Sequence, residues 1–400
     1  MAGVNRPVRL TLLTAHAVFL LCACHRAAVW TARTPDHQSS LVVQARDGRH
    51  CVRLDARDDG CFDGVDVHSI TFDRTGSHAA IAVRVGTRWT VAVDGRPGAP
   101  WDGVGAPRLS ADGAHVAYPA YSGGRWRVAH DANVGPPFDA IVAGSLLIDD
   151  AGCGVVYVAR RGAEHVVVSG ADVSAPWQSV RALALDTAQQ TSCVRRPRTA
   201  FAARDSAGWH LVYDGMVGTA YDDIRDVRFA TSSEVLAIAR RGHRESLLRS
   251  GRPVAWHDAI LRIAVGHDGR VGYLAQEGSD AVAIMEDRAE LARGAVADLA
   301  LGAAGHVAWI LNTGPRQSIV STTGTYQFDR VVEGSLQFVG SGRSWAALVG
   351  DRVRRELRVV IDGRDTGRTF DWSEIARMVR QTGGAESIRA WVASEALRHD

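Results

Sequence analysis

Short apolar runs, separated by polar turns, recur along most of the chain and predict β-strands. Many of them are apolar on both faces, as in AAIAV at 79–83 and AVAIM at 281–285. Strands of this kind belong to sheets that are covered on both sides. Turns such as Asp112-Gly113 supply the positive φ that a tight hairpin needs. The pattern predicts an all-β protein built from short hairpins.

The hairpin pattern itself repeats. The stretches 88–104, 125–141 and 208–224 align residue by residue, and each contains an aromatic residue followed by Asp near its end. This anchor, with Asp or another residue after the aromatic, recurs every 35–44 residues, apart from one interval of 72 that spans two periods with a degenerate copy near Arg293. A period near 40 with about four strands per unit is typical of a β-propeller. The anchors are Phe62, Trp101, Phe138, Trp177, Tyr221, Trp256, Phe328 and Phe370.

The repeat predicts structural duties for its residues. The aromatic anchors are expected to fill the gaps between blades, with Trp101 and Phe138 buried there, and each Asp to accept backbone N–H groups of a turn. No catalytic role is assigned to them. The anchors predict a propeller over 41–371 with about eight four-stranded blades, and seven or nine as the alternatives, because an extra strand pair at 41–55 precedes the first anchor.

Both ends of the chain differ from the repeat. At 372–400, Ile388, Trp391 and Val392 follow helical spacing and predict a short helical tail, with an earlier helix around Ile375. The tail is expected to pack on a face or edge of the propeller, with dimerisation as the alternative. At the N-terminus, an apolar run too short to span a bilayer follows Arg6 and Arg9 and predicts an export signal.

Two resemblances follow from particular motifs. LCAC at 21–24 resembles the lipobox of bacterial lipoproteins, which implies a signal peptide at 1–23, lipid on Cys24 and a linker at 24–40. His25, in place of Asp, implies delivery to the outer membrane. Cleavage elsewhere, for example after Ala28, and an uncleaved anchor are the alternatives.

LSADGAHVAY at 109–118 resembles the WD-like repeats of the TolB propeller, a periplasmic protein. The resemblance covers roughly 40–370. Ala111 departs from the usual Pro, the copies between 256 and 328 have drifted, and the chain has no room for the N-terminal α/β domain of TolB. The resemblance therefore implies the propeller and not the role of TolB.

Charge and cysteines narrow the picture further. A net charge of +2 gives no electrostatic case for nucleic acid. No metal site is predicted, since no Cys/His spacing suits zinc and Arg57 would repel calcium from the acidic stretch at 55–66. An exported chain meets an oxidising compartment, where four cysteines allow three pairings. The expected pairs are Cys51 with Cys61 and Cys153 with Cys193.

Two functional classes remain. The sequence favours a non-enzymatic lipoprotein of the cell envelope, without a cofactor, whose propeller face binds a protein, peptide or glycan and which meets the membrane only through its lipid. The alternative is an enzyme with its site at the channel mouth, either a glycan lyase or hydrolase or a quinone-dependent dehydrogenase. Neither a G-x-S-x-G elbow nor an H-E-x-x-H motif occurs, and the sequence predicts no catalytic residue.

Overall fold

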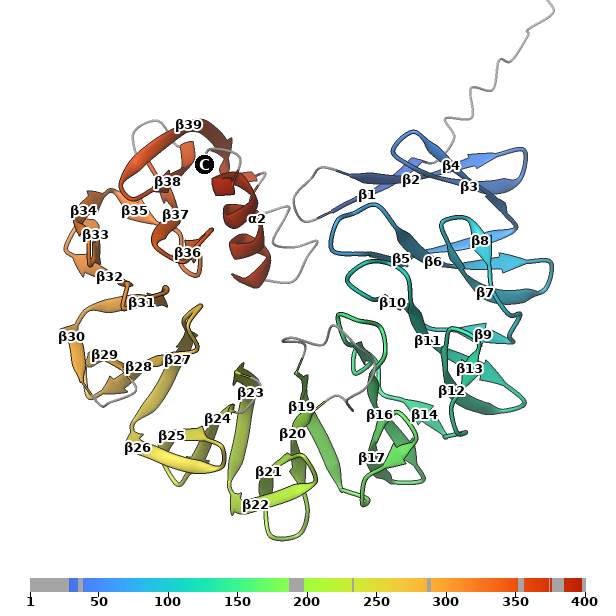
Figure 1. The fold of residues 1–400 in the computed structure, drawn as a ribbon, viewed down its shortest axis with the longest axis horizontal. Coiled ribbons are helices and arrows are strands. Elements are labelled where there is room, and N and C mark those ends of the chain that lie inside the picture. Colours follow the sequence, from blue (N-terminus) through green and yellow to red (C-terminus); the bar gives the residue numbers. More distant parts are fainter. Residues whose placement is uncertain are drawn as a thin grey trace, which may run out of the picture.

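The computed structural model describes residues 29–34, 39–186, 198–231, 234–285, 289–351, 356–373, 375 and 385–397. These residues form nine antiparallel sheets, which follow one another in chain order around an arc (Figure 1). The first strand of each sheet lies nearest the centre. In three sheets this inner strand is split in two, and both pieces pair with the same second strand. The prediction of an all-β propeller is confirmed.

The strands are as follows. Blade 1 contains β1 (Val29–Arg33), β2 (Ser40–Arg46), β3 (Arg49–Leu54) and β4 (Arg57–Phe62). Blade 2 contains β5 (Gly64–Phe72), β6 (Ala79–Val85), β7 (Arg88–Val93) and β8 (Arg96–Pro97). Blade 3 contains β9 (Gly103–Val104), β10 (Arg108–Leu109), β11 (Val116–Ser122), β12 (Arg125–His130) and β13 (Asn133–Val134). Blade 4 contains β14 (Ala140–Ile141), β15 (Leu147–Ile148), β16 (Val155–Arg161), β17 (Glu164–Ser169) and β18 (Asp172–Val173). Blade 5 contains β19 (Ser179–Leu185), β20 (Thr199–Arg204), β21 (Trp209–Tyr213) and β22 (Met216–Tyr221). Blade 6 contains β23 (Asp223–Thr231), β24 (Glu234–Arg241), β25 (Arg244–Arg249) and β26 (Arg252–His257). Blade 7 contains β27 (Ala259–Val265), β28 (Val271–Glu277), β29 (Asp280–Met285) and β30 (Glu290–Gly294). Blade 8 contains β31 (Val296–Leu301), β32 (Val307–Thr313), β33 (Arg316–Ser321) and β34 (Gly324–Phe328). Blade 9 contains β35 (Arg330–Val331), β36 (Gln337–Val339), β37 (Ser344–Gly350), β38 (Glu356–Ile361) and β39 (Arg364–Asp371).

The structure has nine blades where the anchors predicted about eight, and the difference is the first blade. The strand pair seen at 41–55 belongs to a complete sheet, in which β1 pairs with β2 in register from Val29↔Gln44 to Arg33↔Ser40. The strand β1 falls inside the segment predicted as a linker, so the linker prediction is corrected. Its five residues are too few to show a clear alternation, although Trp30 packs against the buried cluster around Leu41.

The core is a series of interfaces between neighbouring sheets. Leu236 and Ile238 of blade 6, for example, share one buried cluster with Ile260 and Tyr273 of blade 7. Each inner sheet therefore buries apolar side chains on both faces, which is why its strands lack a polar face.

The two ends of the arc are finished differently. Helix α2 (Ala385–Leu397) packs on blade 9, where the Trp391 ring meets Phe370 edge-on with centroids 4.6 Å apart. No strand pairs between the first and last sheets among the described residues. The helix predicted around Ile375 lies mostly outside those residues. No helix in the described part of the chain is long and apolar enough to cross a membrane.

The cysteines of the described residues lie in blades 1 and 4. Cys51 of β3 and Cys61 of β4 are direct partners across the two strands and form a disulfide, with Cα atoms 3.9 Å apart. Cys153 is also disulfide-bonded, to a residue outside the described part of the chain. Cys193 lies outside it too, so its pairing with Cys153 stays a prediction.

Candidate functional site

Each aromatic anchor lies near or just beyond the end of the outer strand of its blade, opposite a residue close to the start of the third strand. Trp101 faces Trp89 in this way, and Phe138 faces Trp126. Phe138 is buried as predicted, whereas the prediction fails for Trp101, which is half-buried with its indole N–H 3.4 Å from the Tyr118 hydroxyl. The buried anchors are Phe62, Phe138, Tyr221 and Phe370, and the half-buried ones are Trp101, Trp177, Trp256 and Phe328.

One anchor was placed one residue too early. In blade 6, Glu245 pairs with His257 and not with Trp256, so His257 occupies the anchor position. Its buried ring lies 2.9 Å from Glu277 Oε1 and 3.2 Å from the Tyr273 hydroxyl. Aromatic character drew the sequence alignment to Trp256. The degenerate copy predicted near Arg293 has Gly294 at the anchor position.

The aspartates after the anchors hold turns, as the repeat predicts. Their carboxylates accept the backbone N–H of a glycine in the next blade, at the hairpin between its second and third strands. The glycines have φ values from 59° to 62°, a conformation that other residues adopt with strain. The pairs, with their distances, are Asp63 and Gly86 at 2.6 Å, Asp102 and Gly123 at 3.3 Å, Asp139 and Gly162 at 2.6 Å, Asp222 and Gly242 at 2.6 Å, and Asp258 and Gly278 at 2.7 Å.

Arginines of the inner strands bind the next blade rather than an open channel. Arg181 donates to the Ile224 carbonyl at 3.1 Å, and Arg225 donates to the Ile260 carbonyl at 2.8 Å. Arg262 forms an ion pair with the buried Asp298. Burial, reinforced by Arg389 and Arg228, lowers the pKa of Arg262 to about 9, which leaves it charged at neutral pH.

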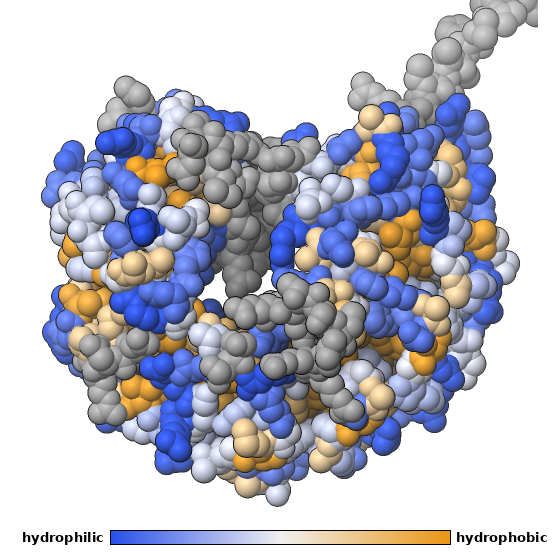
Figure 2. Space-filling view, viewed as in Figure 1, coloured by the Kyte–Doolittle hydropathy of each residue, from blue (hydrophilic) through white to orange (hydrophobic). Residues whose placement is uncertain are grey.

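An excess of carboxylates or histidines around the centre would have favoured the enzyme alternative. Instead, the inner strands carry charges of both signs in pairs, as Arg262 of β27 with Asp298 of β31. A hollow of about 390 Å³ beside them, between the inner strands of blades 4 to 6, is lined largely by apolar residues such as Leu147, Leu185 and Phe229. On the face shown in Figure 2, apolar residues are scattered over the blades and do not form one broad patch.

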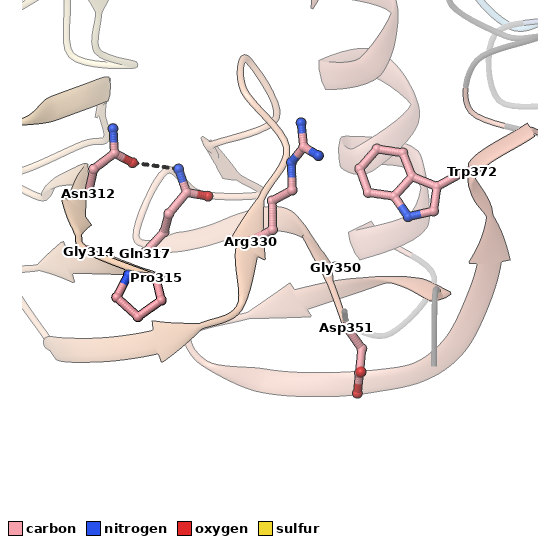
Figure 3. A pocket seen from close by; sticks show the side chains of 8 residues that line it. All are labelled: Asn312, Gly314, Pro315, Gln317, Arg330, Gly350, Asp351 and Trp372. Carbon is pink, nitrogen blue, oxygen red and sulfur yellow. Dashed lines mark hydrogen bonds between the residues drawn. The ribbon is translucent and has the colours of Figure 1, made fainter. Parts of the chain in front are cut away.

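A larger hollow, of about 540 Å³, lies between blades 8 and 9 (Figure 3). The Arg330 guanidinium stands over the Trp372 ring, 5.0 Å from its centroid. Gln317 holds the opposite wall: its Nε2 donates to Asn312 Oδ1 at 2.6 Å, and its Oε1 accepts the Val331 N–H at 2.5 Å. The remaining lining residues are Gly314, Pro315, Gly350 and Asp351.

The lining combines an aromatic ring with planar polar groups. Within the described residues, Arg330 makes no ion pair, so its N–H groups remain available to a ligand. Asp351 is the one carboxylate among the described lining residues. It also borders a smaller hollow of about 200 Å³, where Asp365 is paired with Arg358 at 2.9 Å. Such a set of groups suits recognition of a polar ligand that has one apolar face. The sequence missed the hollow because its residues come from separate hairpins.

A second group of side chains converges on blade 3. His115 Nδ1 lies 2.8 Å from Asp131 Oδ2, and His130 Nε2 lies 3.7 Å from the same oxygen. Local spacing gave no sign of this group, because His115 and His130 meet through the pairing of β11 with β12. The hairpin register, in which Ala117 pairs with His130, was the signal that could have revealed it.

Comparisons with known proteins bear on the fold alone. No protein-family model matches the chain, and no curated protein sequence matches it. A crystal structure of a eukaryotic initiation factor is similar at 9% identity, with a TM-score of 0.49, 86% of this chain and 96% of that one covered. TolB from Acinetobacter baumannii is similar at 14% identity, with a TM-score of 0.27 and coverage of 56% and 61%. The propeller of the Trilobed protease from Pyrococcus furiosus, described as having an open velcro topology, is similar at 11% identity, with a TM-score of 0.29 and coverage of 86% and 97%.

The protein is a β-propeller. At such low identities and TM-scores, this assignment rests on the nine sheets themselves. The similar structures include binding proteins and enzymes alike, so they do not decide between the two functional classes.

Proposed function

We propose that this β-propeller is a non-enzymatic binding protein of the bacterial cell envelope and that it binds a glycan in the hollow between blades 8 and 9. The observation that carries the proposal is the lining of that hollow. Sugar hydroxyls both donate and accept hydrogen bonds, which matches the amide of Asn312 and the guanidinium of Arg330. The C–H face of a sugar ring packs on an indole such as that of Trp372.

The same lining argues against catalysis at this place. Glycoside hydrolysis by the common routes uses two carboxyl groups that flank the scissile bond. Among the described residues that line the larger hollow, Asp351 alone carries a carboxylate, and none is His or Cys. Binding therefore accounts for the lining better than hydrolysis does.

The test is calorimetric titration of the purified chain with a panel of bacterial-envelope oligosaccharides. We expect Trp372→Ala and Arg330→Ala each to weaken binding about five- to thirtyfold, since each removes a contact of about 1–2 kcal/mol. The matched control is Arg241→Ala, because Arg241 stacks over Tyr221 at 5.1 Å in blade 6, far along the chain from the hollow. Circular dichroism checks that each variant is folded.

Three outcomes would overturn the proposal. Glycan binding that survives Trp372→Ala and Arg330→Ala would remove the hollow as the site. Selective binding of peptides in place of glycans would change the ligand class. Turnover of the bound glycan that is lost in Asp351→Asn would establish the enzyme alternative.

The cellular location of the protein is a separate part of the proposal. The lipobox-like LCAC motif supports lipid attachment at Cys24 and delivery to the outer membrane. These residues lie outside the described part of the chain. Acyl chains on Cys24 would hold the propeller at the membrane, with more than one chain needed for stable anchoring.

We expect Cys24→Ala to release the folded protein into the soluble envelope fraction and to abolish labelling by fatty acid. Cys22→Ala is the matched control, because it changes the neighbouring cysteine and leaves the acceptor in place. A Cys24→Ala protein that stays with the membrane, or wild-type protein that takes up no fatty acid, would contradict the lipoprotein assignment.

A further inference from the structure

We propose that His115, His130 and Asp131 form a binding site for a divalent cation of the zinc class at the edge of blade 3. One ligand atom from each residue lies within 4.8 Å of the other two. The side chains are 39%, 23% and 37% exposed respectively, so a cation can enter from solvent and keep water as a further ligand.

The distances are close to those of a metal site. Zinc binds imidazole nitrogen and carboxylate oxygen at about 2.0–2.2 Å, which separates tetrahedral ligands by roughly 3.3 Å. Asp131 Oδ2 lies 2.8 Å from His115 Nδ1 and 3.7 Å from His130 Nε2, on either side of that value. The two histidine nitrogens lie within 4.8 Å of each other. Rotations of the imidazole side chains that move these nitrogens by up to about 1.5 Å bring the three atoms onto one cation.

The surrounding chain holds two of these side chains in place. Asp131 Oδ1 accepts the Val116 N–H at 2.9 Å, which leaves Oδ2 to face the histidines. Gly152 of blade 4 lies against the His115 ring so closely that a Cβ there would come within 2.4 Å of its Cδ2 atom. The Gly152 carbonyl lies 2.8 Å from His130 Nε2, and a bound cation would replace this hydrogen bond.

Blade 2 contains the same arrangement without the third ligand. His78 Nδ1 lies 2.6 Å from Asp94 Oδ2, and Asp94 Oδ1 accepts the Ala79 N–H at 3.1 Å. The position of His130 is occupied there by Val93, and Arg57 lies 2.6 Å from Asp94. The His–Asp pair is thus part of the repeat, whereas the second imidazole belongs to blade 3. The guanidinium in blade 2 would repel a cation.

The ligand set identifies the class of cation. Two imidazoles and one carboxylate suit zinc and its transition-metal neighbours. Calcium and magnesium require several oxygen ligands. The site is on blade 3 and the proposed glycan hollow is on blades 8 and 9, so either proposal can fail without the other.

The test is titration of the metal-stripped full chain with Zn²⁺ against a chromogenic chelator. We expect one site that is lost in His130→Val, which installs the blade 2 residue, and in Asp131→Asn, whose amide oxygen can still accept the Val116 N–H. The matched control, His78→Ala, is expected to leave binding unchanged. Ca²⁺ and Mg²⁺ are expected not to compete at equal concentration.

X-ray absorption of the Zn²⁺-loaded chain is expected to show two imidazoles around the metal in wild type and fewer in His130→Val. Zinc uptake that is unchanged in both His130→Val and Asp131→Asn would overturn the proposal. So would an equal loss in His78→Ala, since that would assign the metal to the repeated His–Asp pair.

Discussion

At the scale of single residues, the aspartate that follows each anchor shows how a repeated carboxylate serves the fold. Asp222 begins blade 6 and reaches the backbone N–H of Gly242 at 2.6 Å, across the hairpin that joins the second and third strands. The glycine needs its φ of 61°, and the carboxylate satisfies the N–H that this turn exposes. The same bond in several blades explains why the sequence repeats Asp at this position without any catalytic reason.

Replacing Asp222 by Ala is expected to lower the free energy of unfolding by about 1 kcal/mol, because one hydrogen bond from an N–H to a charged acceptor is lost at a largely exposed site. Urea unfolding followed by circular dichroism measures the change. Asp47→Asn is the control, since the Asp47 side chain is 93% exposed and its nearest ion-pair contact, with Arg46, is 3.8 Å. Asn also tolerates the φ of 51° at this position. Equal losses in the two variants would contradict the turn-holding role.

The anchors differ in how much stability they contribute. Phe138→Ala is expected to cost about 3–5 kcal/mol, because the ring is 1% exposed and fills the space between blades 3 and 4. Trp101→Ala is expected to cost clearly less, since the indole is half-buried. The two unfolding midpoints in urea give the comparison. A smaller loss for Phe138 than for Trp101 would refute the packing argument.

Several carboxylates link stability to pH. Burial raises the pKa of Asp94, but hydrogen bonds from His78 and the Ala79 N–H, with the charge of Arg57, outweigh it and leave the pKa lowered. Hydrogen bonds from His257 and Arg293 lower the pKa of Glu277. A carboxylate whose pKa is lowered by folding stabilises the protein above its unfolded pKa, near 4, and loses this contribution as the pH falls through the folded value.

The free energy of unfolding is therefore expected to fall as the pH drops below about 4. Asp94→Asn is expected to make this fall shallower while keeping the acceptor for the Ala79 N–H. Urea titrations at a series of pH values measure both slopes. An unchanged slope in Asp94→Asn would show that Asp94 takes no part in the acid response.

Residue-scale features were unevenly predictable from the sequence. The aspartates were, because their role is local and repeated. The position of His257 was not, since its neighbour Trp256 matches the aromatic pattern better and only the strand pairing of Glu245 with His257 settles the register. The group of His115, His130 and Asp131 was hidden for a related reason, because its members meet across a hairpin.

At the scale of elements, helix α2 covers an apolar face of the last sheet. Among the described residues no further sheet packs on blade 9, and α2 covers its apolar face with Ile388, Trp391 and Val392. The Arg368 guanidinium contacts the buried Glu395 at 2.5 Å and ties the helix to β39. Helical spacing was enough to predict such a tail, because apolar side chains three and four residues apart form one stripe. The strand β1 could not be predicted in the same way, since it takes its shape from its partner β2.

Trp391→Ala is expected to cost about 3–5 kcal/mol and to expose the face of blade 9. The exposed apolar surface should then bind the dye ANS and promote self-association, which light scattering detects. Trp256→Ala is the control, because that half-buried ring lies within the arc and is not part of its end. A monomeric Trp391→Ala protein with no added dye binding would show that α2 is dispensable.

At the scale of the whole molecule, the period of about 40 residues determined the architecture, and the strands themselves determined the number of blades. Phe62 is the first anchor in the sequence, but it closes blade 1 and does not open it. Each anchor lies at the end of a blade, so the intervals between anchors count only the blades that follow Phe62. The first blade, 29–62, lies before all of these intervals. The number nine follows once β1 is included.

The open arc also changes how the molecule comes apart. In a closed ring, a blade must break two interfaces before it leaves. Here no buried cluster of the described residues joins blade 1 to blade 9, so stability adds up along a line of nearest neighbours, as in a solenoid. Blade 9 has its helical cap, and fraying should therefore start at blade 1. The amides of β1 and β2 are therefore expected to exchange with solvent first. The amides of β20 and β24, near the middle of the line, are expected to exchange last.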